Sequence, residues 1–278
     1  MTASFSISLR VVLFFVPMVL LSVPSASAIR YDKGTYQRKV YESKARERLN
    51  SFTVQNFTVL HEVSLTREQV SALTKVIESA IATVRNDFQF QPTGTYEVML
   101  FAGGTYEKVD SPNQVTAGFY QAKKIRVRFG DSAGPPGNLG YFRKVFTHEL
   151  THLAVRSLDG GKMTRWMGEG LAVYEEKGIR TRTPFIAKEL YERRNPKYRK
   201  LTPEQFFDFA ATVNSDGTYP PGFYENSYAV TKFIIDEYGF PKVRDLLKRM
   251  KSGASFSAAF KEVYGMTPSE MGAKAYGF

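Results

Sequence analysis

The sequence predicts an α+β fold, with an N-terminal part that mixes strands and helices, a central buried helix and a C-terminal part made of helices. Three observations support this prediction. Strand-like and helix-like hydrophobic patterns alternate over residues 51–129, apolar residues surround positions 147–152, and no convincing strand pattern follows Gly160. The 278 residues are enough for one large or two small packed units.

The first 28 residues have the features of a signal peptide for export. Arg10 supplies the positive end, residues 11–21 are mostly apolar, and Ala26-Ser27-Ala28 is a small-residue cleavage pattern. We therefore expect cleavage at about Ala28 and a periplasmic or extracellular mature protein without a stable membrane span. Retention as an uncleaved anchor is the alternative. The absence of cysteine excludes disulfides and thiolate metal sites.

Charge allows two interpretations of the mature chain. Without Arg10 it carries 37 basic and 27 acidic residues, a net charge of +10. This charge keeps an exported protein soluble, and it also favours attraction to anionic cell-envelope polymers or acidic substrates. Residues 29–50 are interpreted as a basic N-terminal arm. Residues 180–200 are strongly basic as well, either as a solvated surface or as the cationic rim of a cleft. Export and the lack of a recognition motif argue against nucleic-acid binding.

Residues 51–157 are predicted to form the mixed α/β part. Residues 66–88 repeat apolar side chains with helical spacing, and His61 is interpreted as a surface or strand histidine. The expected elements are a strand-like segment at 52–63, a helix at 66–88, a strand at 96–101, hairpin arms at 115–120 and 125–129, a Gly/Pro loop at 130–137, and a buried helix from 139 capped by Asn138.

Two of the three histidines stand at positions 148 and 152, within Thr-His-Glu-Leu-Thr-His. On a helix, positions i and i+4 share a face, so the neutral nitrogens of His148 and His152 can hold one metal ion. Glu149 is rotated around the helix and can reach a water on that metal without ligating it. This is the HExxH pattern of zinc hydrolases.

A catalytic zinc site usually takes three protein ligands, so a third residue is required. Gly160-Gly161 ends the first helix, and a second apolar-periodic segment begins near Trp166. This arrangement allows Glu169 to return to the metal. Glu176 lies seven positions later on the same helical side, where it is either an acceptor for a ligating histidine or a plain surface carboxylate.

The HExxH motif followed by Trp166-x-x-Glu169-Gly170-x-Ala172 resembles the gluzincins, specifically the peptidase-MA-like zinc metallopeptidases. The likeness covers about residues 140–271. It implies a gluzincin-like single domain at 51–278, with a sheet lobe at 51–157, a central HExxH helix and a helical lobe at 158–278. It also implies one Zn2+ ion held by His148, His152 and Glu169, with Glu149 as the general base and a protein or peptide as the substrate.

Zinc aminopeptidases of the same superfamily place a catalytic tyrosine where a helix opens. Tyr224 matches that position here, and Tyr228 is the second choice. The Gly-x-Met-Glu-Asn segment with which aminopeptidases hold a free amino terminus is absent, which favours an endopeptidase. In gluzincins an edge strand beside the zinc helix pairs with the substrate backbone. The hairpin at 115–129 is the candidate for that role, unless it only completes the sheet.

A second class of function stays open on the sequence alone. The chain could be a noncatalytic envelope-binding protein that keeps the metal as a structural cross-link. Glu149 favours the enzyme, because a structural site needs no general base.

Overall fold

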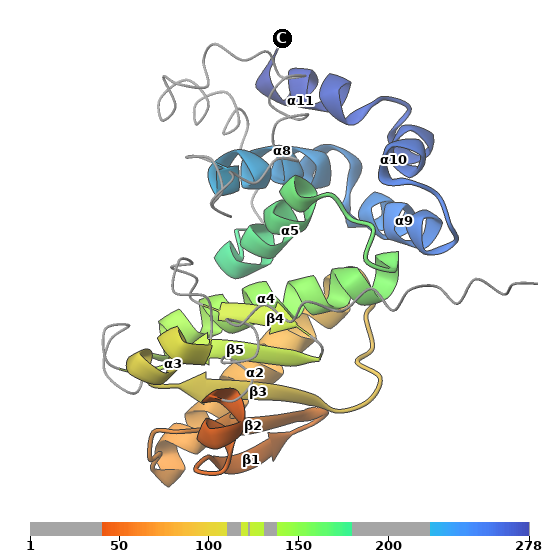
Figure 1. The fold of residues 1–278 in the computed structure, drawn as a ribbon. Helices are drawn as coiled ribbons and strands as arrows, with labels where there is room; N and C mark the ends of the chain where they lie inside the picture. Colours follow the sequence, from red (N-terminus) through yellow and green to blue (C-terminus); the bar gives the residue numbers. More distant parts are fainter. Residues whose placement is uncertain (1–40, 110–117, 122, 131–137, 180–222, 278) are drawn as a thin grey trace, which may run out of the picture.

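The computed structural model describes residues 41–109, 118–121, 123–130, 138–179 and 223–277 (Figure 1). The expected signal peptide, the basic segment at 180–200 and most of both the basic arm and the Gly/Pro loop lie outside these residues. The strands are β1 (Asn50–Val54), β2 (Phe57–His61), β3 (Tyr96–Phe101), β4 (Gly118–Gln121) and β5 (Lys124–Arg128). The helices are α2 (Arg67–Phe88), α3 (Gly103–Val109), α4 (Leu139–Asp159), α5 (Arg165–Lys177), α8 (Phe223–Tyr238), α9 (Phe240–Lys251), α10 (Phe256–Tyr264) and α11 (Pro268–Tyr276).

The strands form one five-stranded sheet in the order β1-β2-β3-β5-β4. The inner pairs β2–β3 and β3–β5 are parallel, and the outer pairs are antiparallel. The segment at 52–63 is therefore not one strand but a hairpin that turns at Gln55, whose φ of 50° lies in the left-handed region. His61 ends β2 and is buried, so its interpretation as a strand residue is confirmed and the surface alternative is wrong.

The central strand β3 is buried on both faces because helices and loops cover both sides of the sheet. Val98 and Leu100 point into the main core with α2 and α4. Met99 and Phe101 alternate to the opposite face, where they pack with α3 and with the segment at 41–49. The helix α3 was not expected from the sequence.

The helix α2 matches the expected segment at 66–88. Thr66 and Gln69 form a capping box, in which the Thr66 hydroxyl accepts from the Gln69 N–H and the Gln69 side chain accepts from the Thr66 N–H. Its apolar face, including Leu73, Ile77 and Val84, is buried. This face packs against α4 as well as the sheet.

In Figure 1 the helix α4 lies between the sheet and α5, and α8 lies beyond α5. The remaining helices, α9, α10 and α11, follow α8 toward the C-terminus. The mixed α+β fold is thus confirmed, while the domain boundaries stay a prediction. Among the helices that the structure describes, none combines the length and apolar character needed to cross a membrane.

Candidate metal centre

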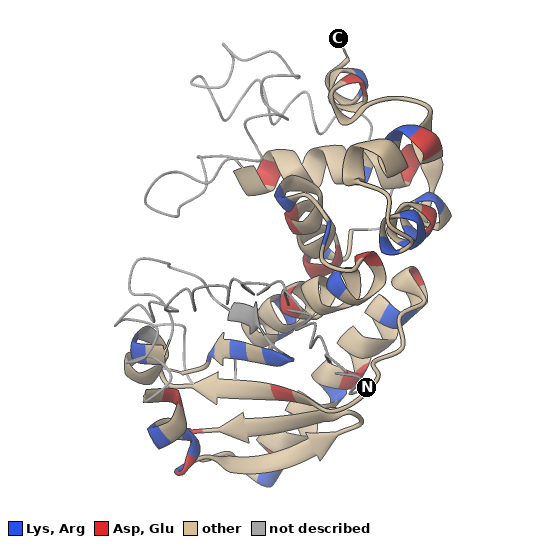
Figure 2. Cartoon of the chain, turned by 45° about the vertical axis from the view of Figure 1, so that its right-hand side comes forward, with Lys and Arg blue, Asp and Glu red and all other residues tan. Residues whose placement is uncertain are grey.

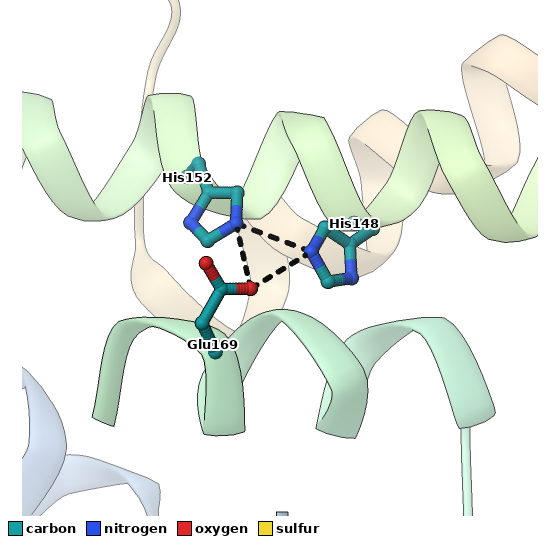
Figure 3. Close-up of side chains that lie close together, drawn as sticks. All are labelled: His148, His152 and Glu169. Carbon is teal, nitrogen blue, oxygen red and sulfur yellow. Dashed lines mark hydrogen bonds and ion pairs between the residues drawn. The ribbon is translucent and has the colours of Figure 1, made fainter. Parts of the chain in front are cut away.

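The helix α4 presents the two motif histidines on one face. Asn138 starts the helix, since its side-chain oxygen accepts from the Tyr141 N–H at 3.0 Å, and Gly160 ends it in a left-handed conformation. Regular helical geometry between these ends brings the Nε2 atoms of His148 and His152 to 3.2 Å from each other (Figure 3).

A tight connection returns the chain along α4. The Asp159 carboxylate is fully buried and accepts from the Gly161 N–H at 2.6 Å and from the Met163 N–H at 2.5 Å. The helix α5 then begins at Arg165 and packs against α4. Trp166 is 2% exposed and anchors the first turn of α5 in the core. Asp159 was not selected from the sequence, although an Asp before Gly-Gly is a turn signal.

Glu169 of α5 points toward the two histidines of α4 (Figure 3). Its Oε2 atom lies 3.2 Å from the His148 Nε2 atom and 3.4 Å from the His152 Nε2 atom. The structure therefore brings together the three residues that the sequence selected as ligands. Among the described residues they form the one group of three side chains with this potential to hold a metal.

The spacing of these three atoms fits a tetrahedral zinc ion. Zinc bonds to imidazole nitrogen and carboxylate oxygen are about 2.0–2.2 Å long, so two ligand atoms of a tetrahedron lie about 3.3–3.6 Å apart. The three separations in the structure are 3.2, 3.2 and 3.4 Å. Two imidazoles and one carboxylate are also the donor set of a catalytic rather than a structural zinc site, because they leave a fourth position for another ligand.

Glu176 orients the ring of His148. Its Oε2 atom lies 3.3 Å from the His148 Nδ1 atom, so a proton on Nδ1 leaves Nε2 as the free donor toward a metal. Of the two interpretations of Glu176, the structure favours the acceptor, because the carboxylate contacts His148.

Electrostatics at the centre favour positive charge. Burial lowers the pKa of His148, but Glu169, Glu176 and Glu149 outweigh this effect and raise the pKa to about 10. Burial also raises the pKa of Glu169, and the two histidines more than offset it, so the pKa lies well below its ordinary value. The carboxylates thus stabilise a cation between the imidazoles.

The two residues expected to take part in catalysis differ in environment. Glu149 lies on α4 and is 7% exposed. Tyr224 lies in the first turn of α8 and is 38% exposed, with its ring edge-on to Phe223 at 5.7 Å. Tyr228, the second choice, is 4% exposed, and the Lys177 Nζ atom lies 5.2 Å from its ring centre. Accessibility therefore favours Tyr224 over Tyr228 as a residue that meets a substrate.

Comparison with known families assigns the chain to a superfamily. The family model of the peptidase MA superfamily matches residues 132–273, which are 142 of the 278 residues. The chain therefore belongs to the peptidase MA superfamily, and the resemblance drawn from HExxH and Glu169 is confirmed. The matched region contains α4, α5 and α8. A search of the curated proteins finds no match.

Proposed function

We propose that this protein is an exported zinc-dependent metallopeptidase that hydrolyses peptide bonds as an endopeptidase. The main support is the triangle of donor atoms from His148, His152 and Glu169, with sides of 3.2, 3.2 and 3.4 Å. Membership of the peptidase MA superfamily supports peptidase chemistry. Export rests on the signal-peptide pattern at 1–28, and the endopeptidase preference rests on the missing aminopeptidase segment.

The side chains divide the reaction between them. A zinc ion at this centre supplies Lewis-acid polarisation and lowers the pKa of water toward about 7. Glu149 accepts the proton of the attacking water and later passes it to the departing amine. The Tyr224 hydroxyl donates a hydrogen bond to the oxyanion of the tetrahedral intermediate. Glu176 holds His148 in the tautomer that leaves Nε2 free.

The substrate backbone would align along the sheet. The strand β4 is at the edge of the sheet, next to β5, and it contacts α4. An edge strand can offer main-chain hydrogen bonds to an extended peptide, which gives affinity without demanding particular side chains. This supports a protein or peptide substrate.

Anionic cell-envelope polymers remain a further proposed partner. Figure 2 shows basic residues along α9, namely Lys242, Arg244, Lys248, Arg249 and Lys251. Several already have partners inside the fold. Arg249 pairs with Glu262, and Arg244 donates to the Asp87 carbonyl at 2.8 Å. The net charge of the whole chain, rather than a dedicated surface on α9, therefore carries this proposal.

The substitution Glu149→Gln tests the function directly. The mature chain (residues 29–278) and the variant should both bind about one zinc per chain, because Glu149 is not a ligand. Hydrolysis of a broad peptide library should fall by about 100-fold to 10,000-fold, the contribution of a positioned general base. Metal content is measured by mass spectrometry, and cleavage by sequencing the products.

Glu78→Gln is the matched control, because Glu78 is an exposed carboxylate on α2. It should behave as the unchanged protein. Zinc binding without any hydrolysis by the unchanged protein would favour the noncatalytic alternative, and full turnover by Glu149→Gln would refute the mechanism.

Tyr224→Phe tests the second catalytic residue. Removing one donor to an oxyanion costs about 100-fold to 1,000-fold in turnover, and zinc content should not change. Steady-state kinetics on a peptide found in the library screen measure this. The comparison is Tyr228→Phe, which should retain turnover because Tyr228 is buried. The opposite ranking of the two variants would move the role to Tyr228.

A further inference from the structure

The helix α5 packs between α4 and α8, and two consecutive residues of α5 face these two helices. Glu169 points to α4, where the histidines lie (Figure 3). The next residue, Gly170, is turned toward α8. A Cβ atom added at Gly170 would come closer than 3.0 Å to three atoms of α8: the Thr231 Oγ1 atom and the Ser227 carbonyl oxygen and carbon. Two of them belong to the backbone, so no rotation of a side chain can relieve the contact.

The facing surface of α8 is built for the same close approach. Ser227 and Thr231 are one turn apart, small and fully buried. Neither hydroxyl has a hydrogen-bond partner within the described ranges. Hydrogen bonds from these two hydroxyls therefore do not hold α5 and α8 together. The small side chains instead allow the two backbones to touch at this point.

The position of this crossing matters because it lies beside the proposed catalytic groups. Gly170 directly follows the ligand Glu169. Ser227 follows Tyr224 by three residues, about one helical turn. The intervening Asn226 is buried and accepts from the Tyr276 hydroxyl of α11 at 2.7 Å, which ties this turn of α8 to the C-terminal helices. A change in the α5–α8 separation would then shift Glu169 relative to the histidines of α4, or shift Tyr224 relative to α5.

We propose that Gly170 is a positioning residue that fixes Glu169 relative to the turn of α8 bearing Tyr224. This inference rests on the proposed function for the roles of these two residues. Gly170 itself touches neither substrate nor metal. Because glycine has no side chain, the backbones of α5 and α8 can come into direct contact at this position. A displacement of about 1 Å in a catalytic group can cost about 100-fold in rate, which is why the spacing is functional.

The test compares two alanine substitutions that flank Glu169. In Gly170→Ala the new methyl group meets the Ser227 backbone. In Gly168→Ala, two residues earlier on the same buried helix, the nearest atom to the new Cβ is the Met163 Cγ atom at 3.6 Å, an ordinary contact. Both changes raise helix propensity alike, so the difference between them reports the crossing alone. The measurements are the zinc dissociation constant, the visible spectrum of the Co2+-loaded protein, and kcat and KM at saturating zinc.

We expect Gly168→Ala to match the unchanged protein within about twofold. For Gly170→Ala we expect either a zinc dissociation constant raised at least tenfold with an altered Co2+ spectrum, or, with zinc bound normally, a kcat lowered at least tenfold at similar KM. The first result means that α5 moves and the second that α8 moves, and both support the proposal. A purely structural role would lower the melting temperature and change none of these readouts.

A milder pair of variants guards against a Gly170→Ala protein that does not fold. Thr231→Ile enlarges the side chain that faces Gly170 from α8, and Thr231→Ala makes it smaller. Thr231→Ile should show the same losses as Gly170→Ala, and Thr231→Ala should not. If both glycine variants, or both threonine variants, behave alike while the unchanged protein binds zinc and cleaves peptides, the inference about Gly170 is wrong and the proposed function stands. If the unchanged protein binds no zinc, the proposed function fails instead.

Discussion

His148 links the candidate metal centre to Glu176, because both of its ring nitrogens have carboxylate neighbours. Its Nε2 atom faces Glu169 at 3.2 Å and its Nδ1 atom faces Glu176 at 3.3 Å. A carboxylate behind a ligating histidine fixes the tautomer and makes the imidazole a stronger donor. The HExxH motif identifies His148 as a ligand but does not predict its contact with Glu176. That contact depends on which face of α5 packs against α4.

Glu176→Gln should weaken zinc binding without abolishing it. The amide keeps the shape and can still accept from Nδ1, while the negative charge is lost, so we expect the zinc dissociation constant to rise about tenfold to 100-fold. Competition with a chromophoric chelator measures the constant. Glu78→Gln again removes a charge elsewhere and should leave the constant unchanged. An unaltered constant in Glu176→Gln would show that the 3.3 Å contact does not support the ligand.

At the scale of the elements, the connection from α4 to α5 determines whether the proposed ligands on these two helices meet in one site. Seventeen positions separate His152 from Glu169, and Asp159 organises the turn between them by accepting from two backbone N–H groups. The turn is also tied to α9, since the Lys162 Nζ atom donates to the Met250 carbonyl at 2.8 Å. The distance between the ligands on α4 and α5 therefore depends on this turn.

Asp159→Ala should destabilise the protein and loosen the site together. Two backbone donors lose their partner, which costs about 1–3 kcal/mol in the free energy of unfolding. Asp159→Asn keeps one acceptor oxygen and should lose less. Urea unfolding in EDTA measures the stability, and zinc titration measures the site. Asp245→Ala, at an exposed position on α9, is the control. Normal stability of Asp159→Ala would mean that the Gly160-Gly161 backbone forms the turn unaided.

The local sequence pattern predicts the helices and strands better than the contacts between them. The helix at 66–88 and the ligands His148, His152 and Glu169 follow from periodicity and motif spacing, which are properties of neighbouring residues. The hairpin turn at Gln55 was missed because apolar residues alternate on both sides of it, and the change of phase from Val54 to Phe57 is a weak signal in a turn without glycine or proline. The close approach at Gly170 was missed because it depends on residues 57 and 61 positions further along the chain. A glycine inside a helix signals such contacts only when the partner helix is known.

At the scale of the whole molecule, the N-terminal segment completes the fold on the face of the sheet away from α4. Residues 41–46 are helical, and Ala45 and Leu49 pack on the apolar cluster that contains Met99 and Phe101. Glu42 fixes this helix to β5. Its carboxylate lies 2.6 Å from the Lys124 Nζ atom and 2.6 Å from the Arg126 Nη2 atom. The expected basic arm at 29–50 therefore includes a docked helix whose attachment depends on an acid.

This attachment predicts a dependence of stability on pH. Burial raises the pKa of Glu42, but Lys124 and Arg126 more than offset it, and the pKa lies below its ordinary value of 4.5. A carboxylate with a lowered pKa stabilises the fold above pH 4.5, and this contribution disappears as the pH falls through the lowered value. Glu42→Gln should then cost about 1–2 kcal/mol of unfolding free energy at pH 7.

The difference should shrink toward zero in acid, because protonated Glu42 and glutamine are both neutral and can form similar hydrogen bonds. Urea unfolding of both proteins at several pH values between about 3 and 7 measures it. EDTA in every sample keeps zinc release from contributing. Glu47→Gln, an exposed change in the same segment, should have little effect at any pH. A difference between Glu42→Gln and the unchanged protein that is constant from pH 7 to acid would mean that the helix at 41–46 is held by its apolar contacts, with no contribution from the charge of Glu42.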